Sequence, residues 1–139
     1  MEHVISGSTV IIRMGPGEDY IEQLTALCSE IPVETAVVLS SIGQMKDFSL
    51  GYFVGPGDYS PDRFQGPHEL LSVSGIISRS GEGYTAHLHA VLGGPEKNVV
   101  GGHLLSGKVE ITNETVLLMV DAKVSRRLDP LTGLLTLAP

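Results

Sequence analysis

Residues 84–104 read YTAHLHAVLGGPEKNVVGGHL and predict a β-hairpin. His87 and His89 are two residues apart, so on a strand both side chains point to the same face. The connection GGPEKN is rich in turn-forming residues, and a strand returning from Val99 brings His103 back alongside. If His103 lies opposite His87 or His89, three imidazoles converge within reach of one ion. A slip of one residue would send His103 to the other face.

The three histidines predict a metal centre. Neutral imidazole is the commonest protein ligand for zinc, and three histidines with one open position form a frequent catalytic arrangement. Gly101 and Gly102 beside His103 leave room for an ion, a water or another chain's backbone. The alternative is that His87, His89 and His103 are polar residues on an exposed or interfacial sheet face. Three glutamates could add a fourth ligand or a general base, although surface carboxylates are the simpler interpretation: Glu69, Glu82 and Glu114.

The flanking sequence predicts a mainly antiparallel sheet and one helix. The helix starts at Glu18 and Asp19, ends before Pro32, and has a periodic apolar face on which Cys28 is buried. Residues 55–67, GPGDYSPDRFQGP, read as a long loop because of their Pro and Gly content. Alternating or continuous apolar runs predict the strands, at residues 9–14, 35–42, 47–54, 69–77, 108–112, 115–121 and 134–137. With no linker visible, residues 1–139 are expected to form a single domain.

Charge and cysteine content restrict the partners. The net charge is −7, from 9 Lys+Arg against 16 Asp+Glu, which has the wrong sign for holding nucleic acid by the chain's own field. The candidates for a local basic patch are interpreted as solvated surface residues: Lys108, Lys123, Arg126 and Arg127. One cysteine permits no internal disulfide, and no apolar run approaches the roughly 20 residues of a membrane span. A cytoplasmic protein without a membrane partner is expected.

Several spaced motifs resemble one known family. They are ELLSVSG at residues 69–75, HLH at 87–89, GGHL at 101–104 and ETVL at 114–117. Together they are similar to the PPC (plants and prokaryotes conserved) domain over nearly the whole chain. The resemblance implies an α+β fold, a mostly antiparallel β-sheet of about seven strands wrapped round one N-terminal helix. It also implies a homotrimer, and the clustered histidines resemble a metal site found in some members.

The chain lacks the DNA-binding segment of plant relatives. Those proteins carry AT-hooks, short Arg-Gly-Arg-Pro segments, before the domain, whereas the only Arg-Arg pair here precedes Leu-Asp. Their protein-contact segment GRFEIL reads GPHELL at residues 66–71, without the Arg and the Phe. The chain therefore resembles the stand-alone prokaryotic type, for which DNA stays a possible partner that the charge does not support.

The expectation is a small, cytoplasmic, homotrimeric PPC-domain protein that holds zinc, or another divalent metal, through His87, His89 and His103. Whether it is an enzyme is left open, as is any substrate. One alternative is a DNA-binding or protein-binding regulatory module without catalysis. The other is a zinc-dependent hydrolase or lyase, in which the metal activates water.

Overall fold

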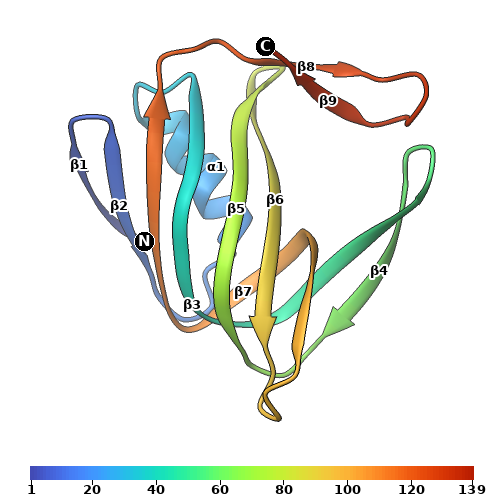
Figure 1. The fold of residues 1–139 in the computed structure, drawn as a ribbon. Coiled ribbons are helices and arrows are strands. Elements are labelled where there is room, and N and C mark those ends of the chain that lie inside the picture. Colours follow the sequence, from blue (N-terminus) through green and yellow to red (C-terminus); the bar gives the residue numbers. More distant parts are fainter.

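Two long, bent strands frame the fold. The computed structural model describes residues 1–139; in it β3 runs from Thr35 to Gly55 and β7 from Val99 to Val120. The two strands pair antiparallel over two stretches, 35–43 with 113–120 and 45–51 with 103–109. Because β7 also pairs with β2 and β6, and β3 with β4 and β5, the two strands connect both halves of the sheet (Figure 1).

Five shorter strands complete the main sheet, which has the order β1-β2-β7-β6-β5-β3-β4. Their bounds are Glu2–Ser6 for β1, Thr9–Met14 for β2, Asp58–Phe64 for β4, His68–Ser80 for β5 and Gly83–Gly93 for β6. A separate two-stranded sheet consists of β8, Ser125–Leu128, and β9, Leu135–Ala138. The predicted fold class, a mostly antiparallel seven-stranded sheet with one helix, is confirmed.

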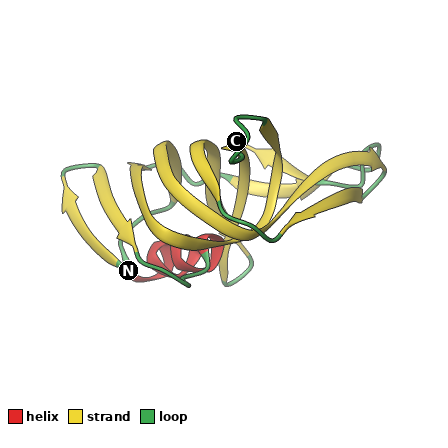
Figure 2. Ribbon diagram, turned by 90° about the horizontal axis from the view of Figure 1, so that it is seen from below, coloured by secondary structure: helices red, strands yellow, loops and turns green.

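The single helix, α1, spans Tyr20–Glu30. The Asp19 carboxylate caps its first turn, accepting from the backbone N–H groups of Ile21 and Glu22 at 3.1 Å each. The buried side chains of the helix recur at helical spacing: Tyr20, Leu24, Leu27 and Cys28. This side packs against one face of the curved sheet, while the β8–β9 hairpin lies beyond the other face (Figure 2). The helix is too short to cross a membrane, and the chain has no other.

Alternation along β6 separates the core from the histidines. Leu88, Ala90 and Leu92 are at most 1% exposed and belong to the core under α1. His87 precedes Leu88 and His89 lies between Leu88 and Ala90; both histidines are exposed, so they point to the opposite face. The predicted division of this strand into an apolar side and a histidine side is therefore confirmed.

A buried polar network ties the helix to both long strands. Tyr20 on α1 donates its hydroxyl to Ser41 Oγ at 2.9 Å, and Ser41 Oγ lies 2.8 Å from Thr115 Oγ1 on β7. Asn113 donates to the same Ser41 oxygen at 3.0 Å. These side chains form hydrogen bonds with one another inside the core. A buried polar group without such a partner would destabilise the fold.

The predicted loop over residues 55–67 is wrong, because Asp58–Phe64 pairs with β3 as strand β4. Pro61 is tolerated there because β4 is the edge strand of the sheet and one of its sides needs no hydrogen-bond donor. The strands expected at 35–42 and 47–54 are one strand, β3, and those at 108–112 and 115–121 belong to β7. Strands β1 and β8 were not predicted.

Candidate metal centre

The structure brings the three predicted histidines together. Each offers one ring nitrogen, and these nitrogens all lie within 4.8 Å of one another. The ring centroids are 5.1 to 5.4 Å apart. His89 is the direct cross-strand partner of His103, which is the register on which the sequence prediction depended. His87 follows on the same face of β6.

Close contact between strand backbones holds the histidine strands in place. Gly75 on β5 lies opposite Leu88 with φ of +149°, and a Cβ there would stand 2.0 Å from the carbonyl oxygen of His87. A Cβ on Gly102 would stand 3.0 Å from the Gly51 carbonyl oxygen. Gly102 therefore leaves room for the β3 backbone of the same chain, which is none of the three uses expected from the sequence.

Tyr59 supports one of the histidine rings. It lies on β4 and stacks on His103 with ring centroids 4.8 Å apart and an interplanar angle of 25°. Gly51 on the neighbouring strand makes this possible, since a Cβ there would stand 3.0 Å from Tyr59 Cδ1. Tyr59 was missed at the level of sequence because residues 55–67 were expected to form a loop. The turn residues of GPGD, which follow an alternating strand, are a signal that could have predicted the hairpin.

The environment keeps two of the rings neutral. Burial lowers the pKa of His103 to about 4, and the nearby charges of His87 and His89 lower it further. Partial desolvation also lowers the pKa of His87, although its side chain stays in contact with solvent, and the charges of His89 and Arg126 act in the same direction. A neutral imidazole has the lone pair that a metal requires, so both shifts favour metal ligation near neutral pH.

The donor set fits a divalent metal such as zinc. Nδ1 of His103 is buried and has no hydrogen-bond partner in the protein, an uncommon state for a ring nitrogen and one that a bound group could relieve. No carboxylate joins the cluster: Glu69 accepts from Gln44 at 2.7 Å, and Glu82 and Glu114 are also outside it. Three histidines without a fourth protein ligand leave an open coordination position.

Other titratable candidates lie away from the cluster. Cys28 is buried on α1 as predicted, and burial raises the pKa of its thiol to about 11, which makes it a poor nucleophile. His3 is exposed, whereas His68 is partly buried and its ring packs edge-on against that of Phe48, with the centroids 5.0 Å apart. Arg126, interpreted from the sequence as a solvated surface residue, is partly buried beside the histidines. The local sequence around Arg126 gave no signal of this burial.

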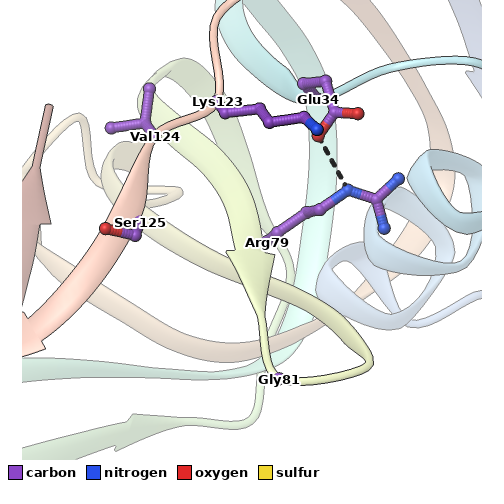
Figure 3. Close-up of a pocket in the computed structure, with 6 residues that line it drawn as sticks. All are labelled: Glu34, Arg79, Gly81, Lys123, Val124 and Ser125. Atoms are coloured by element: carbon purple, nitrogen blue, oxygen red, sulfur yellow. Dashed lines mark hydrogen bonds and ion pairs between the residues drawn. The ribbon is translucent and has the colours of Figure 1, made fainter.

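Another cavity, of about 560 Å³, lies away from the histidines and has a mostly polar lining. It lies between β5 and the segment that leads into β8, and Figure 3 shows Lys123 extending toward the Glu34–Arg79 pair at its wall. Arg79 already donates its Nε–H to Glu34 Oε2 at 2.9 Å. Because its lining is mostly polar and this arginine is paired, the cavity is a weaker candidate than the histidine cluster.

Comparison with known proteins identifies the family of the domain. The sequence model of the Plants and Prokaryotes Conserved (PCC) domain matches residues 1–121. Residues 122–139, which carry β8 and β9, lie beyond that match. The Bifunctional protein GlmU of Synechococcus sp. (strain JA-2-3B'a(2-13)) is 30% identical over 129 residues, covering 91% of this chain and 19% of that protein. The chain thus spans about a fifth of the length of the curated relatives it matches.

Solved structures share the fold. A plant- and prokaryote-conserved (PPC) protein of Pyrococcus horikoshii is 28% identical, with a TM-score of 0.86 over 96% of this chain and 92% of its own. The metal-containing protein AF0104 of Archaeoglobus fulgidus is also 28% identical, with a TM-score of 0.85 over 99% and 97% of the two chains. A proposed DNA-binding protein of Bacteroides thetaiotaomicron has a TM-score of 0.91 over 99% and 96%, but at 24% identity it supports the fold alone.

Proposed function

This chain belongs to the Plants and Prokaryotes Conserved domain family, and from that premise we propose that it is a small zinc-binding protein whose metal is held by His87, His89 and His103. The observation that carries the proposal is the convergence of three ring nitrogens within 4.8 Å. The lowered pKa values of His87 and His103 support it, as does the likeness to a relative that is itself described as metal-containing.

The open position at the cluster favours a second, catalytic version of this proposal. A bound zinc would supply Lewis-acid chemistry and a water of lowered pKa, as in zinc-dependent hydrolases and lyases. The chain's own residues would orient this chemistry: the histidines hold the ion, and the stacked ring of Tyr59 fixes the plane of His103. The lack of a carboxylate in the cluster means that a general base would have to come from outside it.

Self-association into a homotrimer is part of the proposal. Large apolar side chains stand next to core residues in sequence but lie on the sheet face away from α1, where they are 41% to 56% exposed: Ile11, Leu39, Ile42 and Val91. An exposed apolar face of this kind marks an interaction surface in a soluble protein. A second copy of the chain would cover it, in keeping with the family resemblance.

A regulatory role on DNA has less support. The net charge of −7 opposes binding to phosphate, and salt weakens any such contact further. Retention of the protein on random-sequence duplex at about 50 mM salt would favour this alternative. We propose a cytoplasmic location on the basis of the single cysteine, which leaves no internal disulfide to maintain.

Metal analysis of tag-free protein tests the main proposal. Elemental analysis after purification in zinc-supplemented buffer is expected to find close to one zinc per chain in the wild type and little in His89→Ala. His3→Ala is the matched control, because His3 is exposed and outside the cluster, and it should keep its zinc. Equal, near-zero zinc in all three proteins would overturn the site.

A further inference from the structure

The C-terminal hairpin covers part of the histidine face. Strands β8 and β9 lie in residues 122–139, outside the family match, and form a sheet of their own. Arg126 on β8 donates its Nε–H to Ser78 Oγ on β5 at 3.1 Å, and Gly57 N–H at the β3–β4 turn donates to the Thr132 carbonyl at 2.8 Å. The hairpin is therefore attached at two places, and Figure 1 shows it spanning from the end of β5 to the β3–β4 turn.

A cavity of about 380 Å³ lies between this hairpin and the histidines. His87 and His103 form part of one wall, and three leucines of the hairpin form another: Leu134, Leu135 and Leu137. His89 does not line the cavity. An apolar wall facing a few polar groups is the usual composition of a small-molecule site.

Arg126 gives this cavity a positive charge. Its guanidinium is partly buried and is held by Ser78 and by the Leu135 carbonyl, which accepts from Nη1 at 3.2 Å. These two bonds use two of its five N–H groups. The four ion pairs of the protein involve other residues, so this arginine has no carboxylate partner in a chain of net charge −7.

A partly buried arginine without a carboxylate partner favours the binding of an anion. Guanidinium N–H groups match the two oxygens of a carboxylate or the oxygens of a phosphate, and such charge-assisted bonds are stronger where water is partly excluded. The neighbouring leucines would contact an apolar group attached to that anion. The histidines at the opposite wall place the remaining end of the molecule beside the metal position.

We propose that this cavity binds a small organic anion, with its acidic group on Arg126 and its apolar body against Leu134, Leu135 and Leu137. The proposal deepens the proposed function and rests on it in one respect, because the metal at His87 and His103 would contact the bound molecule. The binding of the anion to Arg126 and the leucines needs no metal. The hairpin thus serves as the ligand-selecting part of the site.

Isothermal titration calorimetry of the full chain with hexanoate tests the proposal. Hexanoate has the acidic group and the apolar body, acetate lacks the body, and hexan-1-ol lacks the charge. Arg126→Gln is expected to weaken hexanoate binding about tenfold or more, the usual loss for a charged hydrogen-bonded pair. Arg127→Gln is the matched control, since Arg127 is exposed on the same strand and outside the cavity, and it should change affinity less than twofold.

Two further ligands define the outcome. Hexyl phosphate binding more tightly than hexanoate, with the same dependence on Arg126, would support the proposal and assign the acidic group as phosphate. Hexan-1-ol binding as tightly as hexanoate, or Arg126→Gln titrating like the wild type, would overturn it. Methyl NMR of the wild type gives an independent readout: hexanoate should shift the signals of Leu134, Leu135 and Leu137, whereas shifts confined to Ile11 and Leu39 would contradict the site.

Titrations with and without zinc separate this proposal from the metal site. Zinc-free wild type and His89→Ala are both expected to keep the dependence of hexanoate binding on Arg126, because the acidic group and the apolar body of hexanoate need no metal. If no zinc binds but Arg126→Gln still weakens hexanoate binding, the metal proposal is wrong and the cavity proposal is retained. If zinc binds and Arg126→Gln binds hexanoate with the affinity of the wild type, the cavity proposal is wrong and the metal proposal is retained.

Discussion

His89 and His103 face each other directly across β6 and β7, with ring centroids 5.4 Å apart and ring planes at 86°. A register shift of one residue on either strand would place the two rings on opposite faces of the sheet. The close backbone contacts at Gly75 and Gly102 oppose such a shift, because each lets neighbouring strands approach in one alignment. The geometry of the candidate site is therefore fixed by the backbone of four strands.

Protonation of His103 is expected to destabilise the metal-free protein as pH falls. Its pKa is about 4 in the folded protein, against 6.5 ordinarily, because burial and then the charges of His87 and His89 disfavour the imidazolium. Between these values the unfolded chain binds more protons, so stability rises with pH through this window and this contribution is complete above about 6.5. Urea midpoints measured in EDTA at pH 5 and pH 7.5 should differ less in His103→Gln than in the wild type. His3→Gln is the control, and an unchanged difference in His103→Gln would contradict the assignment.

Gly75→Ala should unfold at a lower urea concentration than the wild type. Its Cβ would collide with the His87 carbonyl, and its φ of +149° is unfavourable for alanine, a strain of about 1–3 kcal/mol before any strand displacement. Gly83→Ala is the matched control, because a Cβ on Gly83 of β6 would meet no atom within 4 Å and the methyl group should be tolerated. Zinc affinity should fall in Gly75→Ala alone, since the His87 backbone has to move. Equal midpoints for the two variants would refute this account.

Removing the ring of Tyr59 should weaken zinc binding while leaving the ligands intact. Groups that orient metal ligands typically contribute about 10–100-fold in affinity, and stacking alone belongs at the low end of that range. Competition with a chromophoric chelator should show the loss in Tyr59→Ala and near-normal affinity in Tyr59→Phe, which keeps the ring. Tyr52→Ala tests specificity, since Tyr52 is 77% exposed and does not stack on a histidine. A loss as large in Tyr52→Ala would show that the effect is not local.

A charge placed on the exposed sheet face should disrupt self-association. Light scattering coupled to size exclusion is expected to give three chain masses for the wild type and a smaller species for Leu39→Glu, because burying an unpaired carboxylate is unfavourable. Leu131→Glu is the control: Leu131 is 85% exposed and lies in the β8–β9 turn, so the mass should not change. A wild type that elutes as a monomer at all concentrations would refute the trimer.

The sequence was sufficient for the core of the fold and the convergence of the histidines. The apolar periodicity of α1, the alternation along β6 and the turn residues GGPEKN act locally, and the structure follows them. Residues whose role depends on long-range packing were not predictable in this way. Tyr59 reaches His103 only because β4 folds back on β3, and Arg126 reaches the cavity only because β8 crosses to Ser78.

Strand continuity was also beyond local reasoning. Gly43 and the polar residues within 44–47 interrupt the apolar pattern of β3, yet the strand continues because β5 and β7 supply hydrogen-bond partners on both sides. Bulges in the β3–β7 pairing absorb the irregularities. A pattern read along one strand contains no information about these partners, so it predicts two short strands where one bent strand exists.

The separation in sequence between paired strands has a consequence for the order of folding. The three histidines come from a single hairpin within residues 87–103, so bringing them together requires closure of only a short loop, which is fast. The β3–β7 pairing joins residues such as Thr35 and Val120, and contacts this distant form slowly. We therefore expect a zinc ion to find its ligands before the sheet is complete, so that during folding the metal would act as an early nucleus around which the slower strands assemble.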